Sequence, residues 1–437
     1  MRILLICYGD FITNSWIHVA AFARALKIAG HDCMVSTPAL PTGRVRAELA
    51  GAALLRHGDP LPCAADIIHI WTPRMAPLRA LLQLVGNTVL QTPRIIVHLE
   101  DNEQHLLSHT AGVPFSALTL QSDRSLHPLI KKGLAHPVRY QLLLAAADLI
   151  TGITPALAAF APPGVPFALL HPGLDLDIFC PQAPDPLLRS ELGLHPTDRV
   201  IVYPGGANLT NATELRTLYM AVALLNQRGH RVKLLRTGPS APWFTNSLTT
   251  EERAHEMALG FVSRNLIPRL LALADMLVQP GSLGPFNDYR LPSKLPEFLA
   301  SGRPVILPAT NIAALMKDGE HALFLRDGSP EDICIQCETL LAQPGLASRL
   351  GEAGRRFAEQ HFDINANART LNQLYHETLA RPVAADWRRA GRRFHDEADL
   401  FPLFSGRATD PSILTMAANR RRLGGFPRHI ARFFTAP

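Results

Sequence analysis

A short segment late in the chain combines groups that suit the binding of a phosphate. Ser293, Lys294 and Glu297 follow a loop rich in Gly, Pro and Asn, and an apolar stretch leads from them to Gly302. Ser293 is a favourable N-cap and Gly302 a favourable stop, so we predict a helix from Lys294 to Ser301. Its free N–H groups and the Lys294 ammonium would hold an anion, and Glu297 could reach hydroxyl groups of the same ligand. The alternative is a merely structural helix, because capped helices occur in any α/β protein.

Strands on either side would position this segment, and similar strands recur along the chain. Apolar runs alternate with helical patterns, which predicts an α/β fold with parallel sheets covered on both faces. The expected strands are 3–7, 33–36, 66–71, 94–99, 148–153, 167–170, 200–203, 232–236, 259–262, 275–279, 304–307 and 322–325. The loops 8–15, 72–78 and 100–108 would follow strand carboxyl ends, where open α/β sheets bind ligands.

The length of 437 residues exceeds one ordinary core, so we expect two domains. The Pro-rich, polar segment 181–198 is the expected linker between a first domain, 1–180, and a second domain, 199–365. A closing helix at 366–380 and a basic extension at 381–437 complete the expected organisation.

The composition is that of a globular protein, with 47% hydrophobic residues. We find neither a signal-like start nor an apolar run of about 18 residues, so we expect a cytoplasmic protein without a membrane span. Cys334 and Cys337 form a CxxC, but they lie in an amphipathic helical pattern without a second ligand pair. We therefore expect no zinc or redox site, and a reducing compartment.

The net charge of +6 belongs to the C-terminal extension. Residues 381–437 hold eleven Arg, no Lys and five acidic residues, which is itself a balance of +6. Arg mixed with aromatic residues is typical of segments that lie on an anionic bilayer, so peripheral contact with the inner face of a membrane is one interpretation. A solvated extension, or one folded back over the first domain, is the alternative. No recognised module supports nucleic-acid binding.

Several strings in order resemble the large retaining, nucleotide-sugar-dependent glycosyltransferase family 4, also called group 1, which has the GT-B fold. They are HPGLDLDIF (171–179), DLITGITPAL (148–157), LGFVSRNLIPRLLALADMLVQPG (259–281) and PSKLPEFLASGRPVI (292–306). The resemblance covers about 1–378 and is strongest in 259–307. It implies two Rossmann-like, doubly wound domains that face a cleft, with the Arg-rich extension outside the family pattern.

The resemblance also implies a donor site in the second domain. Glu297 takes the place of the second glutamate of an E-x7-E motif, which binds the nucleotide ribose. Tyr289 stands at the first glutamate, which contacts the donor sugar, so a phenol replaces a carboxylate there and the motif is degenerate. Ser293, Lys294 and Leu295 begin the helix beside it.

The segment YPGGANLTNATELR lacks the two cations that the family places there to hold the diphosphate. Gly205, Gly206 and Asn208 could still cradle phosphate with backbone N–H groups. Lys294 or Arg290 would replace the lost positive charge, which leaves the donor and the activity itself as the open points.

On the first domain, the resemblance places a sugar-contacting histidine near His98. Glu100 or Asp101 could accept a hydrogen bond from the acceptor hydroxyl, and Lys294 would stabilise the departing diphosphate. The alternatives are a satisfied strand histidine and ordinary surface carboxylates.

Three residues of the first loop, Asp10, Asn14 and Ser15, could bind acceptor hydroxyls. The alternative is a polar turn in which Asn14 or Ser15 caps the following helix.

The sequence thus predicts a metal-independent glycosyltransferase without a cofactor, which uses a UDP- or GDP-linked sugar and a glycan or lipid-linked acceptor in surface or extracellular polysaccharide synthesis. The alternatives are a nucleotide-sugar epimerase or hydrolase of the same fold, or a non-catalytic scaffold that binds a partner.

Overall fold

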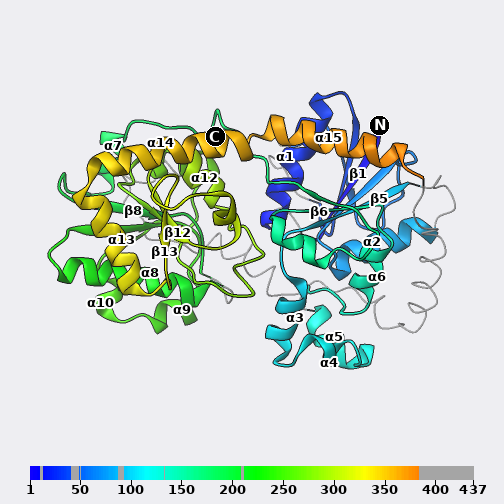
Figure 1. Ribbon diagram of the computed structural model, residues 1–437, viewed down its shortest axis with the longest axis horizontal. Helices are drawn as coiled ribbons and strands as arrows, with labels where there is room; N and C mark the ends of the chain where they lie inside the picture. Colours follow the sequence, from blue (N-terminus) through cyan, green and yellow to red (C-terminus); the bar gives the residue numbers. More distant parts are fainter. Residues whose placement is uncertain are drawn as a thin grey trace.

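The structure is a computed structural model, and it describes residues 1–9, 13–40, 49, 51–86, 93–131, 133–207 and 211–382. Two groups of parallel strands form its two halves, and they lie side by side along the longest axis (Figure 1).

Seven parallel strands form the sheet of the N-terminal half. Their apolar side chains alternate between the two faces, so each face buries its own core. In spatial order the strands are β3 (Ala53–Arg56), β2 (Asp32–Thr37), β1 (Arg2–Cys7), β4 (Ile67–Trp71), β5 (Arg94–Leu99), β6 (Leu149–Gly152) and β7 (Phe167–Leu169).

Helices cover both faces of this sheet. One face packs against α1 (Asn14–Ile28) and a helix from the end of the chain, α15 (Ile364–Ala380). The opposite face carries α2 (Met75–Gly86) and α6 (Arg139–Ala145). Three further helices, α3 (Glu103–Ala111), α4 (Phe115–Leu118) and α5 (Asp123–Lys131), project from one end of the half, and η2 (Pro155–Phe160) precedes β7 (Figure 1).

The C-terminal half contains two three-stranded parallel sheets. They are β10 (Glu256–Ala258), β9 (Val232–Arg236) and β8 (Arg199–Tyr203), then β11 (Leu277–Val278), β12 (Val305–Pro308) and β13 (Leu323–Leu325). A parallel bridge between Ile201 and Met276 joins β8 to the start of β11. The six strands therefore follow one another in the order β10, β9, β8, β11, β12 and β13.

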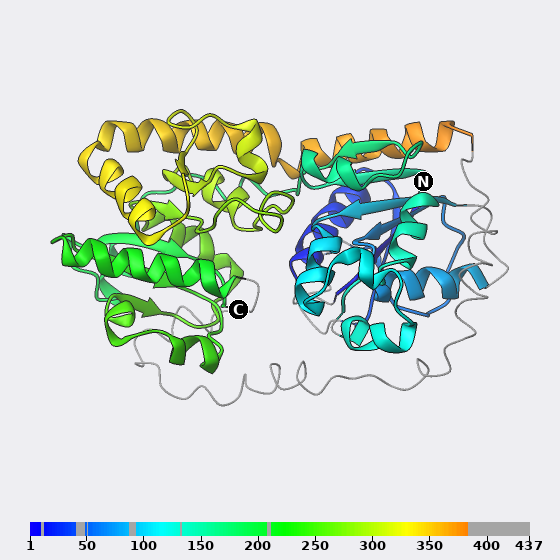
Figure 2. The same cartoon turned by 60° about the horizontal axis from the view of Figure 1, so that its bottom comes forward.

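The helices of this half cover the two sheets and lead back to the first half. They are α7 (Pro186–Glu191), α8 (Ala212–Gln227), α9 (Pro242–Ser247), α10 (Thr250–Arg253), η3 (Arg264–Leu266), α11 (Ile267–Ala272), α12 (Leu295–Ala300), η4 (Asn311–Leu315), α13 (Pro330–Ala342) and α14 (Pro344–His361). From α14 the chain passes into α15, which returns across the N-terminal sheet (Figures 1 and 2). There the buried hydroxyl of Tyr375 lies 2.9 Å from Nδ1 of His69.

The expected α/β architecture with two sets of parallel strands is confirmed, with local corrections. The prediction of a strand at 259–262 is wrong, because the strand that pairs with β9 is β10, which begins three residues earlier, at Glu256. The expected loops at 72–78 and 100–108 are shorter, since α2 begins at Met75 and α3 at Glu103. None of the described helices has the length and apolarity needed to cross a bilayer.

Candidate active site

His98 lies near the carboxyl end of β5 and is almost fully buried. Its Nδ1 is 2.9 Å from the hydroxyl of Thr151 on β6, and its ring centre is 4.3 Å from that of Trp71. Burial lowers the pKa of His98 to about 3, so the ring is neutral near physiological pH. These contacts are those of a satisfied strand histidine, and its participation in catalysis stays a prediction.

Glu100, directly after β5, has donors on both carboxylate oxygens. Oε1 accepts hydrogen bonds from Nδ1 of His18 at 2.9 Å and from Nε1 of Trp71 at 3.0 Å, and Oε2 accepts one from the Ser15 hydroxyl. Burial alone would raise the pKa of Glu100, but the interactions with His18 outweigh burial and lower it to about 2. The ionised carboxylate therefore fastens α1 to the end of β5.

The first loop brings one of the three acceptor candidates to this carboxylate. Ser15 bonds to Glu100, Asn14 is the first residue of α1, and Asp10 lies outside the described residues. The interpretation that Asn14 or Ser15 caps the helix is wrong. Thr13 is the N-cap, and its side-chain oxygen accepts a hydrogen bond from the N–H of Trp16 at 3.4 Å.

An arginine that the sequence patterns did not single out lies at the same sheet edge. Nε of Arg74 donates to Glu103 at 2.8 Å, Nη2 donates to Asp101 at 2.9 Å, and the guanidinium lies 4.4 Å from the ring centre of Tyr8. Burial raises the pKa of Asp101, and it raises that of Glu103 to about 7, with Arg74 opposing both shifts.

Within the described residues, no three His, Cys, Asp or Glu side chains could together hold a metal ion.

On the C-terminal half, the predicted anion-binding helix is shorter than expected. Helix α12 has six residues, and Lys294 is its N-cap in a helical conformation without a side-chain capping bond. The prediction that Ser293 caps the helix is therefore wrong, because a turn that bonds the Leu295 N–H to the Pro292 carbonyl places Lys294 at the cap. The predicted stop at Gly302 is confirmed by its left-handed φ of 71°.

The Lys294 side chain reaches the loop that follows β8. Its Nζ lies 4.5 Å from the ring centre of Tyr203, and a Cβ placed on Gly205 would lie 3.7 Å from the same nitrogen. Among the described residues, no carboxylate lies within ion-pair distance of this ammonium, whereas Arg264 and Arg290 are both paired. Lys294 is thus a cation directed at a glycine backbone.

The loop at Pro239 packs closely against the glycine pair that follows β8, Gly205 and Gly206. A Cβ on Gly206 would lie 2.7 Å from the carbonyl oxygen of Pro239, so the two loops leave no room for a side chain there. The buried Arg236 donates to the Gly205 carbonyl at 3.4 Å and pairs with Glu256 at 2.9 Å. Asn208, the third predicted phosphate-binding residue, lies outside the described residues.

Glu297 faces an arginine that sequence reasoning also missed. Its Oε1 accepts a hydrogen bond from Nη2 of Arg264 at 2.7 Å, and the Glu297 side chain is far less exposed than that of Arg264. Arg264 also lies 5.1 Å from the ring centre of Phe179, at the end of the N-terminal half. Its position within the string that resembles the family was the only signal that could have found it.

Arg290 and Tyr289 belong to the loop before α12, and both have protein partners. Arg290 pairs with Glu214 on α8 at 2.8 Å and donates to Oδ1 of Asn287 at 2.9 Å. The ring centre of Tyr289 lies 5.1 Å from that of Phe160 on η2. Contact of either side chain with a donor stays a prediction.

The same loop forms hydrogen bonds between the two halves. The Thr154 hydroxyl donates to the Tyr289 carbonyl at 2.9 Å, and Nδ2 of Asn102 donates to the Pro285 carbonyl at 3.3 Å. Asn102 caps α3, one residue after Asp101. The loop that leads to Lys294 therefore contacts the N-terminal half directly after Asp101, one of the predicted catalytic residues.

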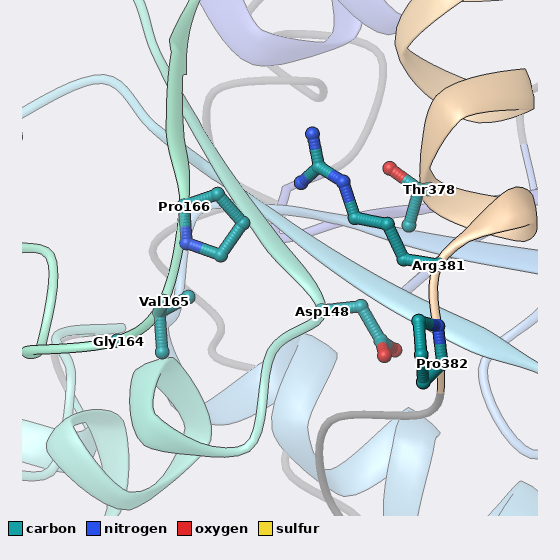
Figure 3. A pocket seen from close by; sticks show the side chains of 7 residues that line it. All are labelled: Asp148, Gly164, Val165, Pro166, Thr378, Arg381 and Pro382. Atoms are coloured by element: carbon teal, nitrogen blue, oxygen red, sulfur yellow. The ribbon is translucent and has the colours of Figure 1, made fainter.

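A cavity of about 640 Å³ lies elsewhere, at the opposite edge of the N-terminal sheet, where β6 begins and α15 ends (Figure 3). Its lining residues are Asp148, Gly164, Val165, Pro166, Thr378, Arg381 and Pro382. Because none of the predicted site residues lines it, we assign it no part in the site.

Comparison with known proteins links the site to one family. Residues 198–343 match the family described as "Glycosyl transferases group 1". The chain is 27% identical to EpsD of Bacillus subtilis (strain 168), provisionally named a glycosyltransferase, over 46% of this chain and 51% of that protein. It is 25% identical to a D-inositol 3-phosphate glycosyltransferase of Streptomyces bingchenggensis (strain BCW-1), over 48% of each chain.

The fold extends the likeness beyond the sequence matches. HepE from Anabaena, solved in complex with UDP, superimposes with a TM-score of 0.61 at 15% identity, over 86% of this chain and all of that one. The chain spans about half the length of the curated relatives it matches. Residues 198–343 thus resemble the group 1 glycosyltransferases, and the chain, with its two groups of parallel strands, has the GT-B fold.

Proposed function

We propose that the protein transfers a sugar from a nucleotide-sugar donor to an acceptor hydroxyl, with retention at the anomeric carbon. One observation carries the proposal: the Lys294 ammonium is unpaired among the described residues and lies against the backbone of Gly205. A fixed cation beside a glycine loop suits the diphosphate of such a donor. The family match over 198–343 supports this assignment, because it contains both residues.

In the proposed reaction the acceptor oxygen bonds to the anomeric carbon on the face from which the diphosphate departs. The bond between that carbon and the diphosphate oxygen breaks, and the acceptor proton passes to the departing diphosphate. Negative charge grows on that diphosphate, and Lys294 with the N–H groups near Gly206 stabilises it by fixed dipoles and charge. Glu297 accepts hydrogen bonds from the ribose hydroxyls, with its carboxylate held by Arg264. UDP is the first nucleotide to test, since HepE is a structural neighbour in complex with UDP, and GDP is the second.

On the acceptor side we assign the contact with the attacking hydroxyl to Asp101, because the oxygens of Glu100 are already bonded to protein donors. Asp101 follows β5, close to the loop from the other half that ends at Lys294. The proposed acceptor therefore lies between the two halves.

We further propose that the two domains divide the binding of the two substrates. We assign the acceptor to the domain 1–180 and the donor to 199–365, joined by 181–198 and closed by 366–380. A role in surface or extracellular polysaccharide synthesis, with peripheral membrane contact through 381–437, fits a glycan or lipid-linked acceptor. Residues 383–437 lie outside the described residues.

A donor and acceptor screen tests the proposal. The protein is incubated with UDP- and GDP-sugars and a panel of glycoside and lipid-linked acceptors, and nucleotide release and the anomeric configuration of the product are measured. We expect acceptor-dependent release of one nucleotide and a product with the anomeric configuration of the donor. Release or isomerisation without an acceptor would replace the transferase with a hydrolase or epimerase. Failure of every nucleotide to bind at millimolar concentration would leave only the scaffold interpretation.

A further inference from the structure

Arg74 connects three segments at the carboxyl edge of the N-terminal sheet. It lies between β4 and α2, directly before Met75, and its side chain is 10% exposed. The guanidinium bonds to Asp101 at 2.9 Å and to Glu103 at 2.8 Å, and it covers the ring of Tyr8 at 4.4 Å. One side chain thus fixes the ends of β1, β4 and β5 relative to one another.

The carboxylates beside Arg74 have different surroundings. The Glu103 side chain is 3% exposed, and its Oε2 is buried without a hydrogen-bond partner in the part of the chain that the structure describes. Both oxygens of Glu100 are bonded to protein donors. The Asp101 side chain is 27% exposed and gives Oδ2 to Arg74, while Oδ1 has no hydrogen-bond partner among the described residues. Of the three carboxylates, Asp101 is therefore the one that is partly exposed and still has an oxygen for a ligand.

We propose that Arg74 is a positioning residue of the transfer reaction: it holds Asp101 so that the second carboxylate oxygen accepts the hydrogen bond of an uncharged acceptor hydroxyl. The inference rests on the proposed function. Glu103 accepts a hydrogen bond from Nε of Arg74, and this bond fixes the orientation of the planar guanidinium. Nη2 of the same group then donates to Asp101. A lysine could supply the charge at this position but not the two fixed hydrogen bonds.

The charges around Asp101 give this role a pH signature. Burial raises the pKa of Asp101, Arg74 and Arg290 lower it, and Glu100 raises it further. Glu103 lies on the other side of the guanidinium. Loss of the Arg74 charge leaves burial and Glu100 opposed by Arg290 alone, so the pKa of Asp101 rises. The fraction of ionised Asp101 then falls at the acidic end of the activity profile.

The experiment uses the full-length chain with Arg74→Lys, Arg74→Gln and Asp101→Asn. Arg94→Lys is the matched control, because Arg94 pairs with Asp148 at the opposite edge of the same sheet, with both side chains 10% exposed. UDP affinity is measured by calorimetry. Transfer is measured with the donor and acceptor that the wild-type screen selects, as kcat and acceptor KM from about pH 5 to about pH 9.

We expect UDP affinity to stay at the wild-type value in all four variants. Acceptor kcat/KM should fall about tenfold or more in Arg74→Lys, Arg74→Gln and Asp101→Asn, and remain unchanged in Arg94→Lys. In Arg74→Gln, the fall of acceptor kcat/KM at the acidic end of the pH profile should move to higher pH. In Asp101→Asn, the part of that fall that comes from protonation of Asp101 should be absent. Because Asp101 is partly exposed, its amide variant tests the assignment even if Arg74→Gln does not fold.

Two results would overturn the inference while leaving the transferase intact. One is an Asp101→Asn enzyme with wild-type acceptor kcat/KM. The other is an Arg74→Lys enzyme that loses UDP affinity and acceptor kcat/KM to the same extent, as a general structural defect would. A wild-type protein that binds UDP but turns over no nucleotide-sugar with any acceptor contradicts the proposed function itself, and the inference falls with it.

Discussion

Glu100 and Glu103 are three residues apart at one sheet edge, yet their pKa values shift in opposite directions. Burial alone would raise the pKa of Glu100, but interactions with His18, His98 and Ser15 outweigh it and lower that pKa to about 2. Burial raises the pKa of Glu103 to about 7; the charges of Asp101 and Glu100 add to this shift, and Arg74 opposes it. The edge therefore holds one carboxylate that is always ionised near neutral pH and one that is partly protonated.

This difference predicts opposite effects of pH on folding stability. The pKa of Glu100 is below its ordinary value of 4.5, so its stabilisation is complete above about pH 4.5 and is lost as pH falls toward about 2. The pKa of Glu103 is above 4.5, so the unfolded chain loses that proton first, and stability falls as pH rises from about 4.5 to about 7.

Urea unfolding at a series of pH values measures both effects. The free energy of unfolding of the wild type, relative to Glu100→Gln, should decrease as pH falls below about 4.5. The free energy of unfolding of the wild type relative to Glu103→Gln should decrease as pH rises toward about 7. Glu320→Gln, which removes an exposed carboxylate paired with Lys317, is the control for the loss of a surface charge. Parallel curves for all three variants would contradict the assigned shifts.

The close approach behind the glycine pair predicts a cost for Gly206→Ala. Its Cβ would lie 2.7 Å from the backbone oxygen of Pro239, so the loop must shift. We expect a loss of about 1–3 kcal/mol in the free energy of unfolding, together with weaker UDP binding. The control is Gly345→Ala on α14, where the nearest atom to a new Cβ is Nη1 of Arg349 at 3.8 Å. It should be neutral or more stable by about 0.5–1 kcal/mol, with UDP affinity unchanged.

Buried strands were predictable from the sequence because their apolar runs are continuous. The prediction for 94–99 matches β5 (Arg94–Leu99), and that for 232–236 matches β9 (Val232–Arg236). β10 (Glu256–Ala258) is short and half-buried, with Glu256 paired to Arg236, so it lacks the continuous apolar run that predicts a strand at 259–262 instead.

The site was less predictable than the strands, because its side chains meet through folding rather than through spacing. Lys294 and Glu297 could be singled out by their places on a predicted helix. Arg74 could not, since its role depends on three strand ends that converge on one guanidinium. Nor could the partner of Glu297, because Arg264 precedes it by 33 residues.

Glu297→Gln tests whether this carboxylate contacts ribose. We expect UDP affinity to fall about tenfold, because a charge-assisted hydrogen bond contributes about 1.5–3 kcal/mol, while the affinity for inorganic diphosphate stays unchanged. Glu252→Gln is the control, since Glu252 is a similarly buried carboxylate paired with Arg216 in the same half. Equal losses for UDP and diphosphate would indicate a general disturbance of the site rather than a ribose contact.

The ring of Tyr203 should help to place the Lys294 ammonium. A cation–π contact contributes about 0.5–2 kcal/mol, so Tyr203→Leu is expected to weaken UDP binding about threefold to tenfold. Tyr203→Phe keeps the ring and should bind UDP within about twofold of the wild type. Calorimetry on both folded variants measures the difference, and identical affinities would remove Tyr203 from the donor site.

The measurement that tests the account most directly is a calorimetric titration of UDP into the wild type, Lys294→Ala and Lys317→Ala. Lys317 is the matched control, because it is an exposed lysine paired with Glu320. We expect saturable binding of UDP to the wild type, an affinity about tenfold or more lower for Lys294→Ala, and no change for Lys317→Ala. Equal affinity of all three proteins for UDP would contradict the assignment of Lys294 and Gly205 as the donor diphosphate site.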